Sequence, residues 1–153
     1  MGNDRHIIQY DQDISLCSGC SGCEVVCGLI HERKTGPAAR RIFVHKDSVQ
    51  MIHTVYTCQQ CAEHPCFDAC PKKIGAMQID EATGIVYVDQ EKCIGCGLCV
   101  KACPFEPKRM QVGVNKKAQK CDLCRDRAEG PACIAECQVM CLGMSDEPIP
   151  AVK

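Results

Sequence analysis

Cysteine is the residue with the clearest chemical potential in this chain, since it occurs 17 times in 153 residues. That share exceeds the roughly 8–10% typical of small scaffolds held together by disulfides or metals. Sixteen of the cysteines fall into four groups of four: Cys17, Cys20, Cys23 and Cys27; Cys58, Cys61, Cys66 and Cys70; Cys93, Cys96, Cys99 and Cys103; Cys121, Cys124, Cys133 and Cys137. Such an internal repeat predicts that one kind of site is built several times along the chain.

The spacing within the groups indicates iron–sulfur clusters. Groups one and three share the pattern C-x2-C-x2-C-x3-C, in which one loop offers three thiolates to a cubane and the fourth cysteine serves the other cluster of a pair. Cys99 and Cys103 are four residues apart, so they lie on one face of a helical turn. Gly95 and Gly97 allow backbone angles that aim N–H groups at cluster sulfurs. The pattern therefore predicts four [4Fe-4S] clusters.

Two other uses of cysteine are less favoured. Zinc sites usually separate two C-x2-C pairs by a longer loop, which groups one and three do not contain. A complete disulfide framework conflicts with the odd number of cysteines and with the reducing cytoplasm, which is the expected compartment. Cys141, the seventeenth, is interpreted as a small buried thiol beside a cluster. The alternative, in which Cys137 and Cys141 are both ligands, stays open.

Charge and hydropathy restrict the partners and the compartment. The net charge is −1, and each oxidised thiolate-bound cluster would add roughly −2, so nucleic acid is not an expected partner. No stretch of 18 apolar residues occurs, so no membrane span is expected. The first ten residues lack the apolar run of a secretory signal, which favours a cytoplasmic location.

Short elements should position the cysteines. Residues 41–45 and 51–56 predict one β-hairpin, and residues 76–80 and 85–89 predict a second around a glycine-containing loop. A short helical turn should start inside each cysteine group and carry its fourth cysteine, with Pro71 and Pro104 ending two of them. The predicted class is α+β, with a cofactor-filled core. Residues 145–153 are expected to form an extended arm.

The sequence resembles the four-cluster electron-transfer subunits of molybdenum, tungsten and nickel enzymes and hydrogenases. The resemblance rests on Cys-Ser-Gly-Cys-Ser-Gly-Cys-Glu-Val-Val-Cys at 17–27, Cys-Gln-Gln-Cys-Ala-Glu-His-Pro-Cys-Phe-Asp-Ala-Cys-Pro at 58–71, Cys-Ile-Gly-Cys-Gly-Leu-Cys-Val-Lys-Ala-Cys-Pro at 93–104 and Cys-Asp-Leu-Cys at 121–124. It departs where Gly28 and Gln138 replace the proline after the fourth cysteine, and where the gap in group four is short.

The resemblance implies two fused ferredoxin-like halves within one domain, 14–45 with 111–144 and 50–110. It implies four ligand sets: Cys17, Cys20, Cys23 and Cys137; Cys27, Cys121, Cys124 and Cys133; Cys58, Cys61, Cys66 and Cys103; Cys70, Cys93, Cys96 and Cys99. Because these sixteen ligands complete the coordination of the irons, no catalysis by this chain is expected.

The partner that the resemblance implies is a large catalytic oxidoreductase subunit, with a tungsten or molybdenum enzyme favoured and the tungsten aldehyde oxidoreductase type preferred among these. Carbon monoxide dehydrogenase, formate dehydrogenase and hydrogenase are the alternatives, and dimethyl sulfoxide reductase-type enzymes have similar subunits. A flavin or NAD subunit or a soluble ferredoxin is a further expected partner, at the end of the row of clusters away from the catalytic subunit. A free-standing polyferredoxin shuttle is the alternative, and end-to-end self-association is a further expectation for a row of clusters with two ends.

Overall fold

The computed structural model describes residues 5–10 and 16–147. In these residues the elements run β1 (His6–Gln9), α1 (Gly22–Glu32), β2 (Ile42–Asp47), β3 (Ile52–Thr57), α2 (Pro65–Asp68), β4 (Met77–Ile79), β5 (Val86–Val88), α3 (Leu98–Ala102), β6 (Met110–Val112), β7 (Ala118–Lys120), α4 (Ala132–Ala135) and β8 (Leu142–Ser145). The strands form four antiparallel pairs, β1–β8, β2–β3, β4–β5 and β6–β7. This mixture of short helices and hairpins confirms the predicted α+β class.

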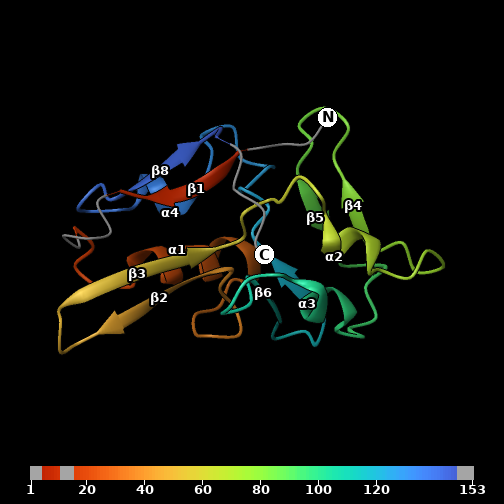
Figure 1. The fold of residues 1–153 in the computed structure, drawn as a ribbon, viewed down its shortest axis with the longest axis horizontal. Helices are drawn as coiled ribbons and strands as arrows, with labels where there is room; N and C mark the ends of the chain where they lie inside the picture. Colours follow the sequence, from red (N-terminus) through yellow and green to blue (C-terminus); the bar gives the residue numbers. More distant parts are fainter. Residues whose placement is uncertain (1–4, 11–15, 148–153) are drawn as a thin grey trace.

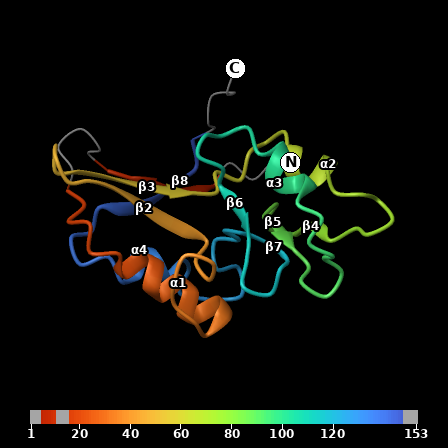
Figure 2. The same cartoon turned by 90° about the horizontal axis from the view of Figure 1, so that it is seen from below.

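The pairs lie in two regions (Figure 1). One contains β1–β8 and β2–β3, with α1 and α4 side by side against them, as Figure 2 shows from below. The other contains β4–β5, β6–β7, α2 and α3. Each region has a buried cluster, and seven of the twelve buried residues in the first are cysteine. Thiols therefore take the place that large aromatic side chains fill in an ordinary core. The exact division into halves stays a prediction.

Both predicted hairpins are present, and an aspartate side chain closes each turn. In β2–β3 the Asp47 carboxylate accepts the backbone N–H groups of Val49 and Gln50, both at 2.9 Å. In β4–β5 the Asp80 carboxylate accepts those of Ala82 and Thr83. A carboxylate that bonds its own backbone two and three residues later is a local turn signal, which is why the sequence reveals these hairpins.

Two strand pairs were not predicted. β6 and β7 pair between Met110 and Lys120, and β1 pairs with β8, so that His6 lies opposite Ser145. The second pair joins the two ends of the described chain. Ser145, predicted as the start of an extended arm, therefore belongs to a paired strand, while residues 148–153 of that arm lie outside the described residues.

The helices begin inside the cysteine groups as predicted. The prediction that each helix carries the fourth cysteine of its group is wrong for three of the four helices. Cys27 lies within α1, whereas Cys70, Cys103 and Cys137 follow the last residues of α2, α3 and α4. α1 continues past Cys27 as far as Glu32, and no proline follows that cysteine. Gly28 stands there instead, and a Cβ at that position would lie 2.5 Å from the Lys34 carbonyl oxygen. The glycine therefore lets the chain fold back closely on the helix.

Candidate metal centres

Four cysteines from the second region surround one cavity, here called site III. Cys58 and Cys61 follow β3, Cys66 belongs to α2, and Cys103 follows α3. The cavity is partly open to solvent, and its empty space, open solvent included, is about 330 Å³. These are the cysteines that the resemblance assigned to one cluster, brought together from segments about 40 residues apart in sequence.

A second cavity of about 330 Å³, site IV, is lined by Cys70, Cys93, Cys96 and Cys99. Cys96 is exposed, while Cys99 is buried on α3. The loop has no room for a side chain at Gly95, since a Cβ there would lie 2.0 Å from the Lys116 carbonyl oxygen. This close approach lets the segment before β7 pack directly on the cysteine loop.

A third cavity of about 320 Å³, site I, is lined by Cys17, Cys20, Cys23 and Cys137, together with Cys141. The sulfur of Cys141 lies 3.6 Å from that of Cys137. Cys141 is buried, as its interpretation as a small core thiol requires, and it lines the same side of site I as Cys137.

The remaining four cysteines form site II, which is buried between α1, α4 and the loop after β7. Cys27, Cys121, Cys124 and Cys133 are each at least nine-tenths buried. Burial raises the pKa of the Cys133 thiol, and the nearby Cys27 and Cys124 thiols raise it further. Burial likewise raises the pKa of Cys121, and the Cys133 thiol raises it further. The four sulfurs therefore lie close enough to affect one another's ionisation.

Helices connect the sites in pairs. α1 carries Cys23 of site I and Cys27 of site II one turn apart, and it packs against α4, which carries Cys133 of site II. α2 and α3 are likewise in contact, with Cys66 of site III on one and Cys99 of site IV on the other. The sites thus form two pairs, I with II and III with IV.

Gln60 joins the two pairs. Its side-chain amide donates to the Cys121 carbonyl at 2.8 Å and to the Val86 carbonyl at 3.1 Å, and its oxygen accepts the Val86 N–H at 2.9 Å. Its own N–H lies 3.5 Å from the Cys58 sulfur. One residue that is only 1% exposed therefore contacts the backbone of site II, the sulfur of site III and the edge of β5.

Backbone N–H groups point at cysteine sulfurs in all four sites. The donors and acceptors are Gly22 to Cys20 in site I, Arg41 to Cys27 and Leu123 to Cys121 in site II, Gln60 to Cys58 and Arg109 to Cys103 in site III, and Ala118 to Cys93 in site IV, at 3.2–3.5 Å. Such bonds favour a thiolate over a thiol. The arrangement suits sulfurs that carry negative charge.

Without added positive charge, several of these sulfurs resist ionisation. Burial raises the pKa of Cys66 to about 12, and burial with the nearby Glu24 raises that of Cys23 to about 12. Four thiolates around one cavity need a cationic centre between them. Among the residues that the structure describes, no three His, Cys, Asp or Glu side chains converge tightly enough to hold a single metal ion. A set of four cysteine donors is the set that holds a cluster of several irons.

Three charged residues lie beside the sites, where the sequence did not place them. Arg41, beside site II, forms ion pairs with Asp122 at 2.8 Å and Glu32 at 3.7 Å. Lys120 and Arg109 line site III. No local pattern marks these residues, although the position of Lys120 directly before Cys121 is a signal that could have been followed.

The comparisons with known proteins bear on this arrangement. A family model described as the 4Fe-4S dicluster domain matches residues 49–147, which is more than half of the chain. The chain belongs to the 4Fe-4S dicluster family. It is therefore a member of an iron–sulfur electron-transfer family, as the sequence predicted.

Two relatives illustrate the breadth of the dicluster family. The chain is 44% identical over 121 residues to the polyferredoxin-like subunit of an aliphatic sulfonate oxidoreductase from Pyrococcus furiosus, covering 79% of this chain and 66% of the relative. It is 39% identical over 146 residues to the electron transport protein HydN of Escherichia coli, covering 82% of this chain and 80% of the relative.

A solved structure has a similar fold. It is the active site complex BamBC of benzoyl coenzyme A reductase with 1,5-dienoyl-CoA, which aligns with a TM-score of 0.51 at 23% identity and covers 97% of this chain and 82% of that one. At this identity the likeness concerns the fold alone. In the residues that the structure describes, no helix has both the length and the apolar character needed to cross a membrane.

Proposed function

We propose that this chain carries four [4Fe-4S] clusters and passes electrons for a partner oxidoreductase. The proposed ligands are the sixteen cysteines of sites I to IV, as the resemblance implied. The observation that supports this most directly is that three cavities each have four of these cysteines in their walls, while the other four are buried together. Each bound cluster would supply a one-electron redox centre.

The protein's own residues have three tasks in this function. The cysteines hold the irons as thiolates, and the backbone N–H groups described above stabilise negative charge on the sulfurs. Buried apolar side chains, among them Val86, Met77 and Leu142, keep water from the walls of the cavities. With all irons coordinated by protein, the chain offers no open position for a substrate, so we assign catalysis to the partner.

We place the catalytic partner at the site I end. Cys20 and Val139 of the cavity wall are exposed there, and Met140, which follows Val139 in the sequence, is 79% exposed, with Leu16 also exposed. The segments 16–24 and 134–147 contain no lysine or arginine. An apolar face with little positive charge suits a permanent subunit interface, which is more hydrophobic than a transient one.

The identity of the partner follows from the resemblance. We propose a large catalytic subunit of the tungsten aldehyde oxidoreductase type, working in the cytoplasm. One relative named above is a subunit of an oxidoreductase, which supports a role of this kind.

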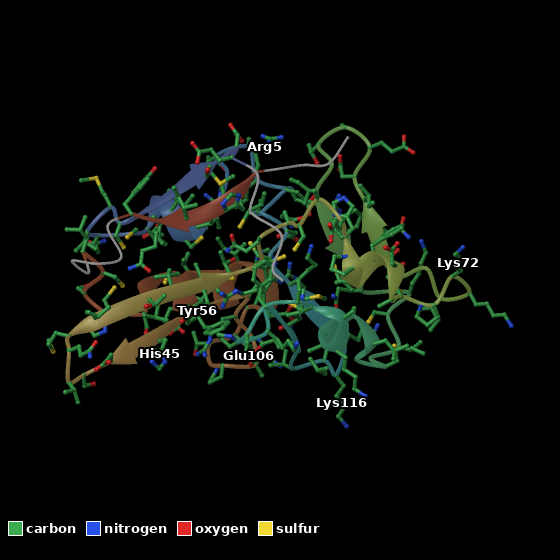
Figure 3. The ribbon with its side chains drawn as sticks, in the orientation of Figure 1. Arg5, His45, Tyr56, Lys72, Glu106 and Lys116 are labelled. Atoms are coloured by element: carbon green, nitrogen blue, oxygen red, sulfur yellow. The ribbon has the colours of Figure 1, made fainter. Side chains whose placement is uncertain are left out.

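We place a soluble acidic redox carrier, such as a small ferredoxin, at the site IV end. Cys96 is exposed, and Ile94 beside it is 68% exposed. Lys101 on α3 is exposed, and Lys72 and Lys116 project outward around this end (Figure 3). Positive charge around an exposed apolar centre steers an acidic protein and speeds its encounter.

The first experiment is anaerobic purification of the native complex. We expect about sixteen irons per chain, tungsten in the accompanying large subunit, and four reducible paramagnetic centres in this chain. Molybdenum or nickel in place of tungsten would refute the partner proposed. A chain that elutes alone would favour the free-standing shuttle, and far fewer irons would refute the four clusters.

A second experiment tests the site IV end with a purified acidic two-cluster ferredoxin. In stopped-flow measurements, Lys101→Glu with Lys116→Glu should lower the second-order rate constant of electron exchange at least tenfold at low salt and weaken its salt dependence. Lys46→Glu, on the exposed β2–β3 hairpin, is the matched control and should leave the rate nearly unchanged. Equal rates for all three proteins would contradict the assignment.

A further inference from the structure

Charged side chains are distributed unequally among the four sites. In the described residues, no Asp, Glu, Lys or Arg side chain lines the cavity of site IV, and Glu136 is the only one of these that lines the cavity of site I. At site II the charge of Arg41 is offset by its ion pairs with Asp122 and Glu32. The cavity of site III, by contrast, is lined by both Lys120 and Arg109.

Lys120 is a buried ammonium group. It is 2% exposed, and its Nζ donates to the Val86 carbonyl at 2.7 Å and lies 3.4 Å from the Gln60 side-chain oxygen. It forms no ion pair with any carboxylate of the described residues. Burying an unpaired charge is costly unless something compensates it. The negative charge that site III would carry is the compensation that the structure offers.

Arg109 is a second cation at the same cavity. Its guanidinium carbon lies 4.2 Å from the ring centre of Tyr56 and 5.5 Å from that of Phe105. Its Nε and one Nη atom are buried and have no hydrogen-bond partner among the described residues. The nearby Glu106 is exposed and lies 4.0 Å from Lys108 instead. Two rings thus hold the guanidinium beside the cavity, where no carboxylate of the described residues forms an ion pair with it.

We propose that Lys120 and Arg109 make site III the position in the row that accepts an electron most readily. This inference rests on the proposed function, because it requires a cluster at each site. Reduction adds one negative charge, and fixed cations favour the reduced form strongly where little water screens them. Net local charge and burial are established means of setting cluster potentials. Site III would then hold an electron at the centre of the row, between the two ends.

The test is a redox titration monitored by electron paramagnetic resonance on the isolated holo-protein. We expect the most positive of the four midpoint potentials to belong to site III. Lys120→Met should lower the equilibrium constant for reducing that centre at least tenfold, which is about 59 mV for one electron. The other three centres should move less. Arg109→Met should shift the same centre in the same direction.

Three comparisons make the result decisive. Lys120→Arg retains the charge, so it should retain the wild-type potential, whereas a purely structural role would not predict this rescue. Lys46→Met removes an exposed charge and should shift none of the centres. Should Lys120→Met bind less iron, Arg109→Met decides the question, because its backbone contact to Cys103 does not involve the changed side chain.

An unchanged potential in Arg109→Met and Lys120→Met at full iron content would overturn the inference, as would a shift in a different centre. The iron content and the number of reducible centres report separately on the proposed function. A wild-type protein with fewer than four centres would therefore refute that function rather than the role of the two cations.

Discussion

Replacing Gln60 by methionine tests whether one buried amide joins the two pairs of sites. Methionine has a similar length and an unbranched shape, so it should fill the same space without hydrogen bonds. The change would leave the Val86 N–H and the Cys121 carbonyl without their present partner, while the Val86 carbonyl would keep its bond from Lys120. Each buried group left unpaired costs about 1–3 kcal/mol. We therefore expect a loss of about 3 kcal/mol in stability.

The appropriate assay is kinetic, since a protein that loses a tightly bound cofactor does not unfold in a simple two-state manner. We would follow the decay of cluster absorbance under anaerobic conditions with an iron chelator and moderate guanidinium chloride. Every 1.4 kcal/mol corresponds to about a factor of ten. If most of the loss speeds opening of the native protein, Gln60→Met should lose its clusters about tenfold to a hundredfold faster than the wild type.

Gln119 provides a matched control. It is also 1% exposed, but neither atom of its side-chain amide has a hydrogen-bond partner among the described residues. Gln119→Met should therefore change the decay rate little or slow it, because it removes an unpaired buried polar group. The reasoning is refuted if both variants lose their clusters equally fast, or if Gln60→Met behaves like the wild type.

Three further predictions concern the sites themselves. Gly95→Ala should lower the iron content to about twelve per chain, because its Cβ would meet the Lys116 carbonyl. Gly97 has the same φ of +74° but open space around it, so Gly97→Ala should retain all four clusters. An iron assay compares the two variants. Cys141→Ala should keep about sixteen irons and Cys137→Ala should not, and the reverse result would make Cys141 the ligand. Anaerobic removal of iron should abolish the strand signal in circular dichroism, since cysteine thiols form most of the buried cluster in the region of β1–β8 and β2–β3. An unchanged spectrum would show that the fold does not depend on the clusters.

Some features of this protein are decided by short stretches of sequence. The cysteine spacing places three potential ligands on one loop regardless of the rest of the chain, and Asp47 and Asp80 close their hairpins through bonds to residues only two or three positions away. Interactions over such short separations can be read from sequence, because no distant partner has to be known. The cysteine groups and both hairpins were predictable for this reason.

Other features depend on contacts between distant segments. β1 pairs with β8 across almost the whole chain, and β6–β7 lacks a turn residue as clear as those aspartates. The helix ends also differ from the prediction, because proline and packing, rather than cysteine position, decide where each helix stops. The short strands of the β1–β8 and β6–β7 pairs have little conformational preference of their own, so each forms where a neighbouring strand supplies its hydrogen bonds.

The sequence by itself therefore determined the kind of chemistry, through the type and spacing of its cysteines. Only the tertiary structure decided which charges and amides surround each site. Lys120 and Gln60 come from segments 60 residues apart, yet both bond to Val86 on β5. Their effect arises from burial, because water would screen the charge and compete for the hydrogen bonds at the surface, and burial is a property of the folded chain rather than of any residue in it.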